Sequence, residues 1–393
     1  MARRHMVSPR PARQALAMMH PWRTSALASR HRELGSDLED WNGMGTAWTY
    51  ATPLADAYTA IRTRAGLMDV SGLKKVHVVG PHAEATLQRA VTRDVRRLAP
   101  GQAVYATMLG DHGKFVDDCI VYRTGPTAWM VVHGSGAGHQ MLGAETHGRQ
   151  VALLFDDDLH DLSLQGPLAV DFLERHIPDV RQLRYFHHRP ATLFGAPIML
   201  SRTGYTGERG YEIFCRSEDA PLIWDTILED GEEEGIVACA FTALDWLRVE
   251  SYLLFYPFDN SEMYPFADEP PGDTLWELGL EFTVTPGKQG FRGAEEHARL
   301  HGRERFRIFG LLLEAEVAAA EGDRVWDGEQ LVGVITCAMY SPLSEQSMAI
   351  ARLAPDMAAH GRPLRVTGSG EFSASAHSLP FLDPQKARRT AAD

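Results

Sequence analysis

The run Ser201-Arg-Thr-Gly-Tyr-Thr-Gly-Glu-Arg-Gly-Tyr-Glu-Ile-Phe214 decides more about this chain than any other stretch of its 393 residues. Three glycines, Gly204, Gly207 and Gly210, stand within seven positions of the run. They predict a tight turn, because glycine adopts backbone angles that other residues avoid. The run therefore joins two ordered elements through a backbone of unusual conformation.

The second half of the run alternates as a strand does. Glu212 and Phe214 therefore share one face, and Tyr211 and Ile213 share the other. A carboxylate fixed just after a glycine-rich turn can accept two parallel hydrogen bonds from a flat N–H/NH₂ edge. From the residues alone, Glu212 is a candidate ligand contact or, equally, a solvated acid on a strand edge.

Helices and hairpins alternate over the first three quarters of the chain. Helical periodicity or composition marks four segments, residues 53–68, 81–90, 221–234 and 238–250. Strand patterns mark residues 75–80, 103–108, 114–122 and 129–133, with residues 110–113 as a hairpin turn. This mixture predicts an α+β fold and argues against a parallel, doubly wound sheet.

Beyond about residue 305 the pattern changes to short strands separated by turn residues. The expected strands cover residues 306–313, 324–326, 333–337, 348–353 and 363–366. Such a texture predicts a separate, small β domain.

Composition narrows the functional classes. A net charge of −13 argues against a general nucleic-acid or acidic-membrane binder. No apolar run approaches the roughly 20 residues that span a bilayer. The four cysteines are far apart, which fits a reducing compartment and predicts a cytoplasmic protein.

The first 33 residues form a predicted basic tail. Residues 1–32 contain no Asp or Glu but seven arginines. This composition is typical of an organelle transit peptide, and equally of a plain basic tail. The mitochondrial matrix is therefore the alternative location.

Several further motifs stand in a fixed order along the chain: Ala65-Gly-Leu-Met-Asp-Val-Ser71, Leu109-Gly-Asp-His-Gly-Lys-Phe-Val-Asp-Asp118, Leu164-Gln-Gly-Pro167, Leu247-Arg-Val-Glu250 and Lys288-Gln-Gly-Phe-Arg-Gly293. Together with the 201–214 run, they resemble the glycine cleavage T-protein family of tetrahydrofolate-dependent aminomethyltransferases and their demethylase relatives. The resemblance implies a folate-binding region over 34–300. It also implies an inserted ferredoxin-like part, roughly 76–150 plus 251–300, a β-barrel or jelly-roll domain over 301–384 and a tail over 385–393.

The same resemblance assigns the site residues. It makes Asp118 the catalytic carboxylate beside the folate nitrogens. The residues that it places around tetrahydrofolate are Glu212, Tyr205, Tyr105, Gln165 and Arg248. A carboxylate near those nitrogens stabilises a one-carbon cation in transit and relays protons.

The residues themselves leave plainer interpretations open. Asp117 and Asp118 are neighbours on one strand and point to opposite faces, so they cannot share a proton; both also fit surface acids of a hairpin. Tyr105 and Tyr205 are explained by packing as well as by a ligand. Arg248 pairs inside the molecule or is exposed.

Departures from the family pattern concern the donor. Leu244 stands where those enzymes carry an arginine, Arg352 where they carry a tyrosine, and the proline before Glu277-Leu-Gly-Leu280 is absent. We therefore expect a small methylated amine as one-carbon donor. The alternatives are a lipoyl carrier protein, as in glycine cleavage, or non-catalytic folate binding.

Residues 255–276 mix aromatic and acidic side chains. Such a loop forms either a cage for a methylated ammonium group or a self-packed cover. Lys288 is a candidate cation for the folate tail or a solvated loop lysine. His187 and His188 lack further ligands nearby, so we expect no metal and an exposed position for both. The run Gly134-Ser-Gly-Ala-Gly138 is predicted to be a turn.

Overall fold

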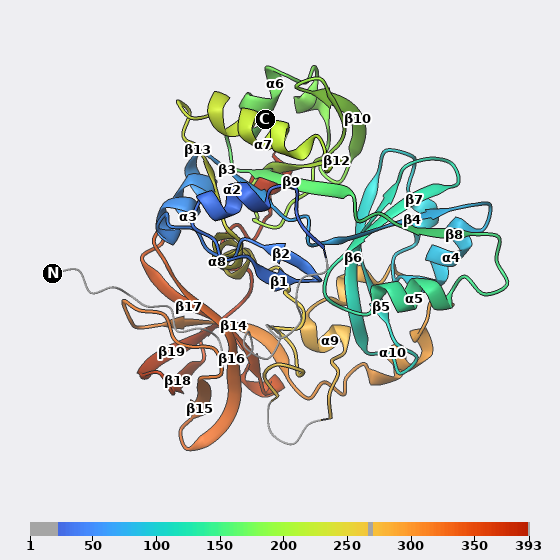
Figure 1. The fold of residues 1–393 in the computed structure, drawn as a ribbon. Coiled ribbons are helices and arrows are strands. Elements are labelled where there is room, and N and C mark those ends of the chain that lie inside the picture. Colours follow the sequence, from blue (N-terminus) through green and yellow to red (C-terminus); the bar gives the residue numbers. More distant parts are fainter. Residues whose placement is uncertain (1–22, 266–269, 392–393) are drawn as a thin grey trace.

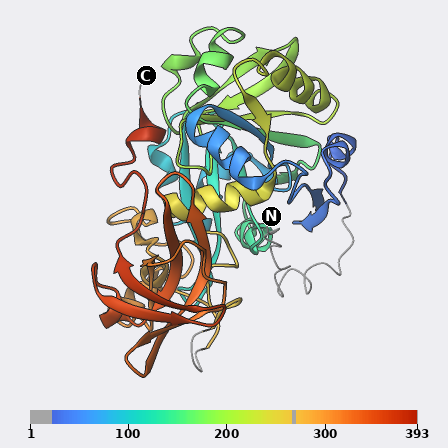
Figure 2. The same ribbon diagram turned by 90° about the vertical axis from the view of Figure 1, so that its left-hand side faces the viewer.

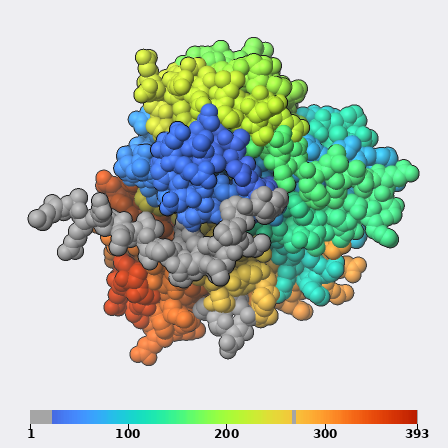
Figure 3. All heavy atoms as spheres, in the orientation of Figure 1, coloured from blue at the N-terminus to red at the C-terminus, as the bar shows by residue number. Residues whose placement is uncertain are grey.

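A computed structural model describes residues 23–265 and 270–391 of the chain. Its two sheets and a closed barrel surround a central helix, α8 (Phe241–Ser251) (Figures 1 and 2). In the space-filling view, the N-terminal segment (blue) lies between the yellow-green part and the orange-red barrel (Figure 3). The predicted transit segment lies mostly in residues 1–22, outside the described residues.

The first sheet has six strands in the order β10 (His188–Leu193), β11 (Ala196–Ser201), β12 (Gly210–Arg216), β9 (Leu159–Gln165), β3 (Ala65–Asp69) and β13 (Ile236–Ala238). Neighbouring strands are antiparallel except β13 and β3. The helices α6 (Ala169–Glu174) and α7 (Ala220–Asp230) bury their apolar side chains against this sheet, in a core that also takes in Leu27.

The second sheet has five strands in the order β5 (Ala103–Leu109), β6 (Phe115–Arg123), β7 (Ala128–His133), β4 (Lys74–Val79) and β8 (Ala152–Phe155). All pairs in it are antiparallel. Two helices, α4 (Ala83–Ala90) and α5 (Gly138–Ala144), share a core with one face. The chain leaves the first sheet after β3 and returns to it at β9, so the second sheet is an insertion.

The third part is a closed six-stranded barrel. Its strands follow the order β14 (Arg307–Leu313), β17 (Gln346–Leu353), β16 (Gln330–Ser341), β15 (Arg324–Asp327), β18 (Pro363–Thr367) and β19 (Glu371–His377). The fold class predicted from the sequence, α+β with an inserted domain and a C-terminal barrel, is confirmed. The residue boundaries of the domains stay predictions.

The remaining elements connect these parts: α2 (Ala28–Glu33), β1 (Glu39–Trp41), β2 (Met44–Thr46), α3 (Leu54–Thr63), α9 (Leu275–Leu278), α10 (Ala294–Leu300) and α11 (Ala387–Thr390). At the end of the predicted basic tail, Leu27 and His31 are fully buried. Helix α8 lies on α3 and on β16 of the barrel, and these elements share the central core.

The helix predicted over residues 53–68 is shorter in the structure. It ends at Thr63, and Ala65–Asp69 forms β3. The segment is a strand because β9 and β13 pair with it. Its neighbours come close at Gly66, where a Cβ would lie 2.5 Å from the sulfur of Cys239 and 2.6 Å from Ile61. The periodicity of residues 53–68 could not predict this pairing, because the partner strands come from elsewhere in the chain.

Candidate functional site

The glycine-rich turn closes around Gln165. The amide of Gln165 donates to the carbonyl oxygen of Thr203 at 3.1 Å and accepts from the hydroxyl of Thr206 at 3.0 Å. A Cβ on Gly204 or Gly210 would lie 2.2 or 2.3 Å from that amide. Glycine is thus required by close approach, and fully buried Gln165 organises the turn from within.

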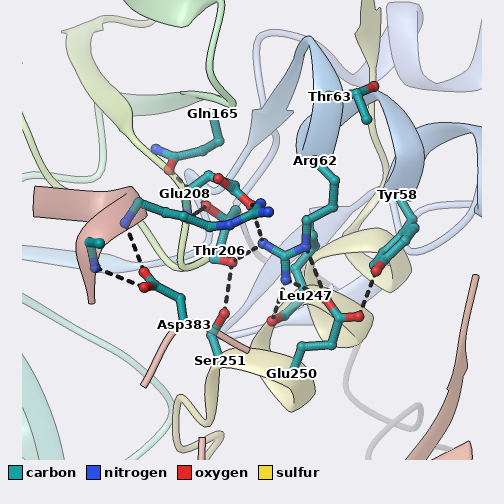
Figure 4. Close-up of polar contacts among 12 residues, drawn as sticks. Tyr58, Arg62, Thr63, Gln165, Thr206, Glu208, Leu247, Glu250, Ser251 and Asp383 are labelled. Atoms are coloured by element: carbon teal, nitrogen blue, oxygen red, sulfur yellow. Dashed lines mark hydrogen bonds and ion pairs between the residues drawn. The ribbon is translucent and has the colours of Figure 1, made fainter. Parts of the chain in front are cut away.

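A buried ion-pair network fixes the outer side of the turn (Figure 4). Arg62 of α3 pairs with Glu208 at 2.8 Å and with Glu250 of α8 at 2.6 Å, and donates to the carbonyl oxygen of Thr206. The hydroxyl of Tyr58 donates to the other oxygen of Glu250 at 2.5 Å. Because every charge in it has a partner, this network serves to hold the turn against the two helices.

Glu212 lies on the face of β12 that meets the five-stranded sheet. Its Oε2 accepts hydrogen bonds from Thr203 and, at 3.3 Å, from the hydroxyl of Tyr122 on β6. Phe214 lies on the same face and packs edge-on against Tyr122, whereas Tyr211 and Ile213 lie in the opposite core, as predicted. Burial raises the pKa of Glu212, so a partner with N–H donors would stabilise its carboxylate.

Asp118 lies on β6 with Tyr105 of β5 beside it. The Tyr105 hydroxyl donates to Oδ2 of Asp118 at 2.7 Å. Burial, and then the charge of Asp117, raise the pKa of Asp118 to about 7, although the Tyr105 hydrogen bond opposes them. Such a carboxyl group exchanges protons near neutral pH, which suits a general acid or base.

The two neighbouring aspartates do point to opposite faces of β6. Asp117 is fully buried on the helix side with Cys119, and Asp118 is half-buried on the side of Ile120 and Tyr122. The interpretation of both as exposed hairpin acids is wrong. Asp118 and Tyr122 share one face four residues apart, or roughly 13 Å along the strand, so this face leads from Asp118 to Glu212.

Tyr205 and Arg248 are held by the elements around them. The Tyr205 hydroxyl donates to the carbonyl oxygen of Leu253 at 2.8 Å. Arg248 is fully buried, with Nε 2.9 Å from Asp245 and a second ion pair to Asp259. Burial raises the pKa of Tyr205, which also lies in the electrostatic field of Arg248 and Asp118.

The structure thus brings together two groups of predicted residues. Tyr105, Asp118, Tyr205 and Arg248 interact electrostatically in one group. Glu212 lies on β12 of the other sheet, where it accepts a hydrogen bond from Tyr122 of β6, and Gln165 lies beneath the turn. The residues that sequence reasoning missed are Tyr122 and Thr203; both carry hydroxyl groups within motifs or strands that were identified, but only the meeting of the two sheets shows their common target.

Two predictions outside this set fail. Lys288 donates to the backbone carbonyls of Val91 and Arg93 at 2.7 and 2.5 Å, and burial lowers its pKa to about 7. It is therefore a backbone tie and no free cation. His188 is buried and packs edge-on against Tyr122, so the exposed position predicted for it is wrong.

The aromatic side chains of the 255–276 loop do not converge on a cage within residues 255–265 and 270–276. Phe255 and Phe258 stack on each other in the central core. Tyr264 donates to Glu321 of the barrel at 2.8 Å, and Trp276 stacks on His297. The predicted alternative, a packed cover, describes these residues; Phe266 lies outside the described residues.

Two of the three positions that depart from the family pattern, Leu244 and Arg352, are buried. Leu244 is part of the central core. The guanidinium of Arg352 lies 3.7 Å from the centre of the Phe306 ring and 3.5 Å from Asp273. Both side chains therefore support the packing between the loop and the barrel.

Neither of two hollows on the surface is lined by Asp118 or Glu212. One, of about 510 Å³, is lined by His176 and Phe194 among others, and the second, of about 270 Å³, by Met130 and Phe214. In residues 23–265 and 270–391, no cluster of His, Cys, Asp or Glu has the geometry of a metal site. No helix in this part of the chain is long and apolar enough to cross a membrane.

The six-stranded sheet, the inserted five-stranded sheet and the C-terminal barrel define the class of protein. Residues 27–288 match the GCVT N-terminal domain, and residues 307–383 match the glycine cleavage T-protein C-terminal barrel domain. The chain belongs to this family of transferases.

Individual relatives sharpen the assignment. The chain is 68% identical over 374 residues to the heme-dependent oxidative N-demethylase gamma subunit of Ectopseudomonas mendocina. This match covers 95% of this chain and 100% of that protein. It is 32% identical over 371 residues to an aminomethyltransferase of Chlorobium phaeovibrioides, covering 92% and 98%. The crystal structure of glycine cleavage system aminomethyltransferase T from Bartonella henselae superposes with a TM-score of 0.80 at 24% identity, covering 92% of this chain and 98% of that chain.

Proposed function

We propose that this transferase moves a one-carbon unit, released by oxidative N-demethylation of a small methylated amine, to tetrahydrofolate. The observation that carries the proposal is the pair Asp118–Tyr105, a carboxyl group with a pKa of about 7 on the face that leads to Glu212. The 68% identity to an N-demethylase gamma subunit supports the methylated amine as the source of the carbon.

The residues present fit a folate. Oε1 of Glu212 makes no hydrogen bond within residues 23–265 and 270–391, while Oε2 is held by Thr203 and Tyr122. This oxygen is an acceptor for the N–H edge of a pterin. In the neighbouring group, Nη2 of Arg248 is buried and has no hydrogen-bond partner among the residues that the structure describes. Glu212 would hold the pterin, Tyr205 and Tyr105 would border it, and Gln165 would keep the turn in shape.

Tetrahydrofolate supplies, when bound, two amine nitrogens that together accept a carbon at the oxidation level of formaldehyde with loss of water. Asp118 would supply a negative charge and a proton acceptor next to those nitrogens. As a carboxylate, its Oδ atoms stabilise positive charge on the incoming carbon and take up the proton that the attacking nitrogen loses. The Tyr105 hydroxyl fixes Oδ2 and leaves Oδ1 for this exchange.

The donor follows from the oxidation level. Two electrons must leave an N-methyl group before its carbon reaches the level of formaldehyde, and an oxidising partner subunit would remove them. We therefore propose that the chain works within a multi-subunit demethylase. The lipoyl carrier of glycine cleavage is the second candidate donor; the family resemblance favours it, whereas Leu244 and Arg352 count against it.

The test is product analysis. Tetrahydrofolate is incubated with the chain and, in separate reactions, with formaldehyde, with a methylated amine plus an amine-oxidising partner, and with an aminomethyl-lipoyl carrier. We expect acceleration of methylene-folate formation, read by mass, in the first two reactions. Acceleration with the lipoyl carrier alone would support glycine cleavage, and binding without any acceleration would support a non-catalytic folate-binding protein.

A further inference from the structure

A hydrogen-bonded series of titratable side chains, Asp117, His133 and His139, lies on the opposite face of β6 from Asp118. Oδ2 of Asp117 accepts from the Gly138 amide at 2.9 Å and lies 2.8 Å from Nδ1 of His133 on β7. Nε2 of His133 lies 2.5 Å from Nδ1 of His139 on α5. Asp117 and His133 are buried, and His139 is half-buried against the ring of Phe155, so the series leads from the interior to the surface.

The glycine run 134–138 packs closely against Asp117 and His133 of this series. A Cβ on Gly136 would lie 2.5 Å from Cγ of Asp117, and one on Gly138 would lie 2.7 Å from both Oδ2 of Asp117 and Nδ1 of His133. The segment that the sequence analysis interpreted as a turn thus encloses a carboxylate and the imidazole that pairs with it. Asp117 is fixed where its charge is felt by Asp118, whose amide donates to Oδ1 of Asp117 at 3.0 Å.

The hydrogen bonds allow one mobile proton on the histidine pair. If both rings are neutral, His133 donates to Asp117 through Nδ1 and accepts from Nδ1 of His139 through Nε2. With one added proton, His133 donates at both nitrogens and His139 accepts. His133 lies between Asp117 and His139, so the proton that it then shares with His139 lies next to the Asp117 carboxylate. Burial and the neighbouring His133 lower the pKa of His139 to about 4.

We propose that Asp117, His133 and His139 form a charge switch that sets the proton affinity of Asp118. When the pair holds its proton, the charge of Asp117 is offset and Asp118 ionises more readily. When the pair is neutral, the bare charge of Asp117 keeps the proton on Asp118. The proton enters and leaves through His139, so the switch responds to the outside without opening the site. These three are positioning residues, and their relevance to turnover rests on the proposed role of Asp118.

Other ionisable groups face the same elements and complete the electrostatic setting: Lys74 on β4, Asp157 after β8, Cys119 on β6, Tyr256 of the 255–276 loop, and Tyr105 and Tyr205 on the side of Asp118. Lys74 lies in the fields of both Asp117 and His139, and burial lowers its pKa. It does not take part in the hydrogen bonds that link Asp117, His133 and His139. The proton on the histidine pair is the part of this setting that changes.

The experiment is a direct titration of Asp118 in the resting full-length chain, without folate or donor. The carboxyl carbon is followed by NMR after ¹³C-aspartate labelling, and the Asp118→Asn variant assigns the signal. Asp117→Asn should lower the midpoint by about one pH unit, a tenfold change in proton affinity, because a like charge is removed. His133→Asn keeps an N–H donor but cannot carry the proton, so it should raise the midpoint.

His139→Phe keeps the packing on Phe155 at a half-buried position and removes the acceptor of the added proton. It should also raise the midpoint, even if Asp117→Asn does not fold. His147→Asn, an exposed histidine just beyond α5, is the matched control and should leave the midpoint unchanged. A midpoint that stays the same in His133→Asn or His139→Phe overturns the switch. Since no folate is present, this result stands apart from the outcome of the product analysis.

Discussion

Two glycine-rich runs enclose one side chain each, and the two side chains differ in charge. Residues 204–210 close around the neutral amide of Gln165, and residues 134–138 close around the carboxylate of Asp117. An acidic residue that we propose to act in the site stands beside each, since Glu212 follows the first run and Asp118 follows Asp117. The neutral centre fixes a shape, whereas the charged centre also changes the proton affinity of its neighbour. Two runs of three glycines each therefore serve different purposes, and the enclosed side chain decides which.

The largest expected effect separates the two aspartates. Asp118→Asn should lower turnover by about 10²–10³, because charge stabilisation in the reacting site is lost, and should leave folate binding largely intact. Asp117→Asn should cost much less at neutral pH, since it favours the ionised form of Asp118. Steady-state kinetics and calorimetry on both variants make the comparison. A greater loss in Asp117→Asn would mean that the charged run encloses the reacting group itself.

Next to residues 204–210, which enclose the neutral Gln165, the expected effect is on the affinity for tetrahydrofolate. Glu212→Gln should weaken tetrahydrofolate binding by about 1–3 kcal/mol, because a charge-assisted contact to the pterin edge is lost. Isothermal titration calorimetry measures it, with the exposed Glu218→Gln as control. Unchanged affinity in a folded Glu212→Gln variant would contradict the proposal that the pterin binds next to this turn.

The glycines themselves allow a comparison of stability. Gly210→Ala and Gly138→Ala should each lower the free energy of unfolding by about 1–3 kcal/mol, since the new methyl group meets Gln165 at 2.3 Å or Asp117 at 2.7 Å. Gly134 has no neighbour within 4 Å of its Cβ position, so Gly134→Ala should be nearly neutral. Urea unfolding compares the three, and a large loss at Gly134 would contradict close approach as the reason for glycine.

The smallest expected effect is on pH dependence. The pKa of Asp118 is raised to about 7, so its carboxylate fraction falls as the pH drops below that value. If the carboxylate is the active form, kcat should fall about tenfold per pH unit on the acid side. An Asp117→Asn variant should move this limb to lower pH, whereas Gly134→Ala should not. A flat profile between pH 5 and 8 would exclude Asp118 as the titrating group.

The sequence by itself determined the α+β class, a separate C-terminal β domain, the glycine-rich turn before β12 and the opposite faces of Asp117 and Asp118. These features follow from local rules, since glycine content and the two-residue period of strands are written into neighbouring residues. The family motifs, read in order, added the inserted domain and the C-terminal barrel. Each motif is short and weak alone, and their common order along the chain makes the resemblance specific.

Only the tertiary structure decided which polar side chains meet. Ala65–Asp69 is a strand because β9 and β13 arrive beside it, and Arg248 and Lys288 are tied internally by groups up to 197 residues away in sequence. The run 134–138 reads locally as a turn, and only the placement of β6 beneath it reveals Asp117 with His133 and His139. Charge pairing and burial depend on contacts between distant segments, and these contacts set the proton affinity of Asp118.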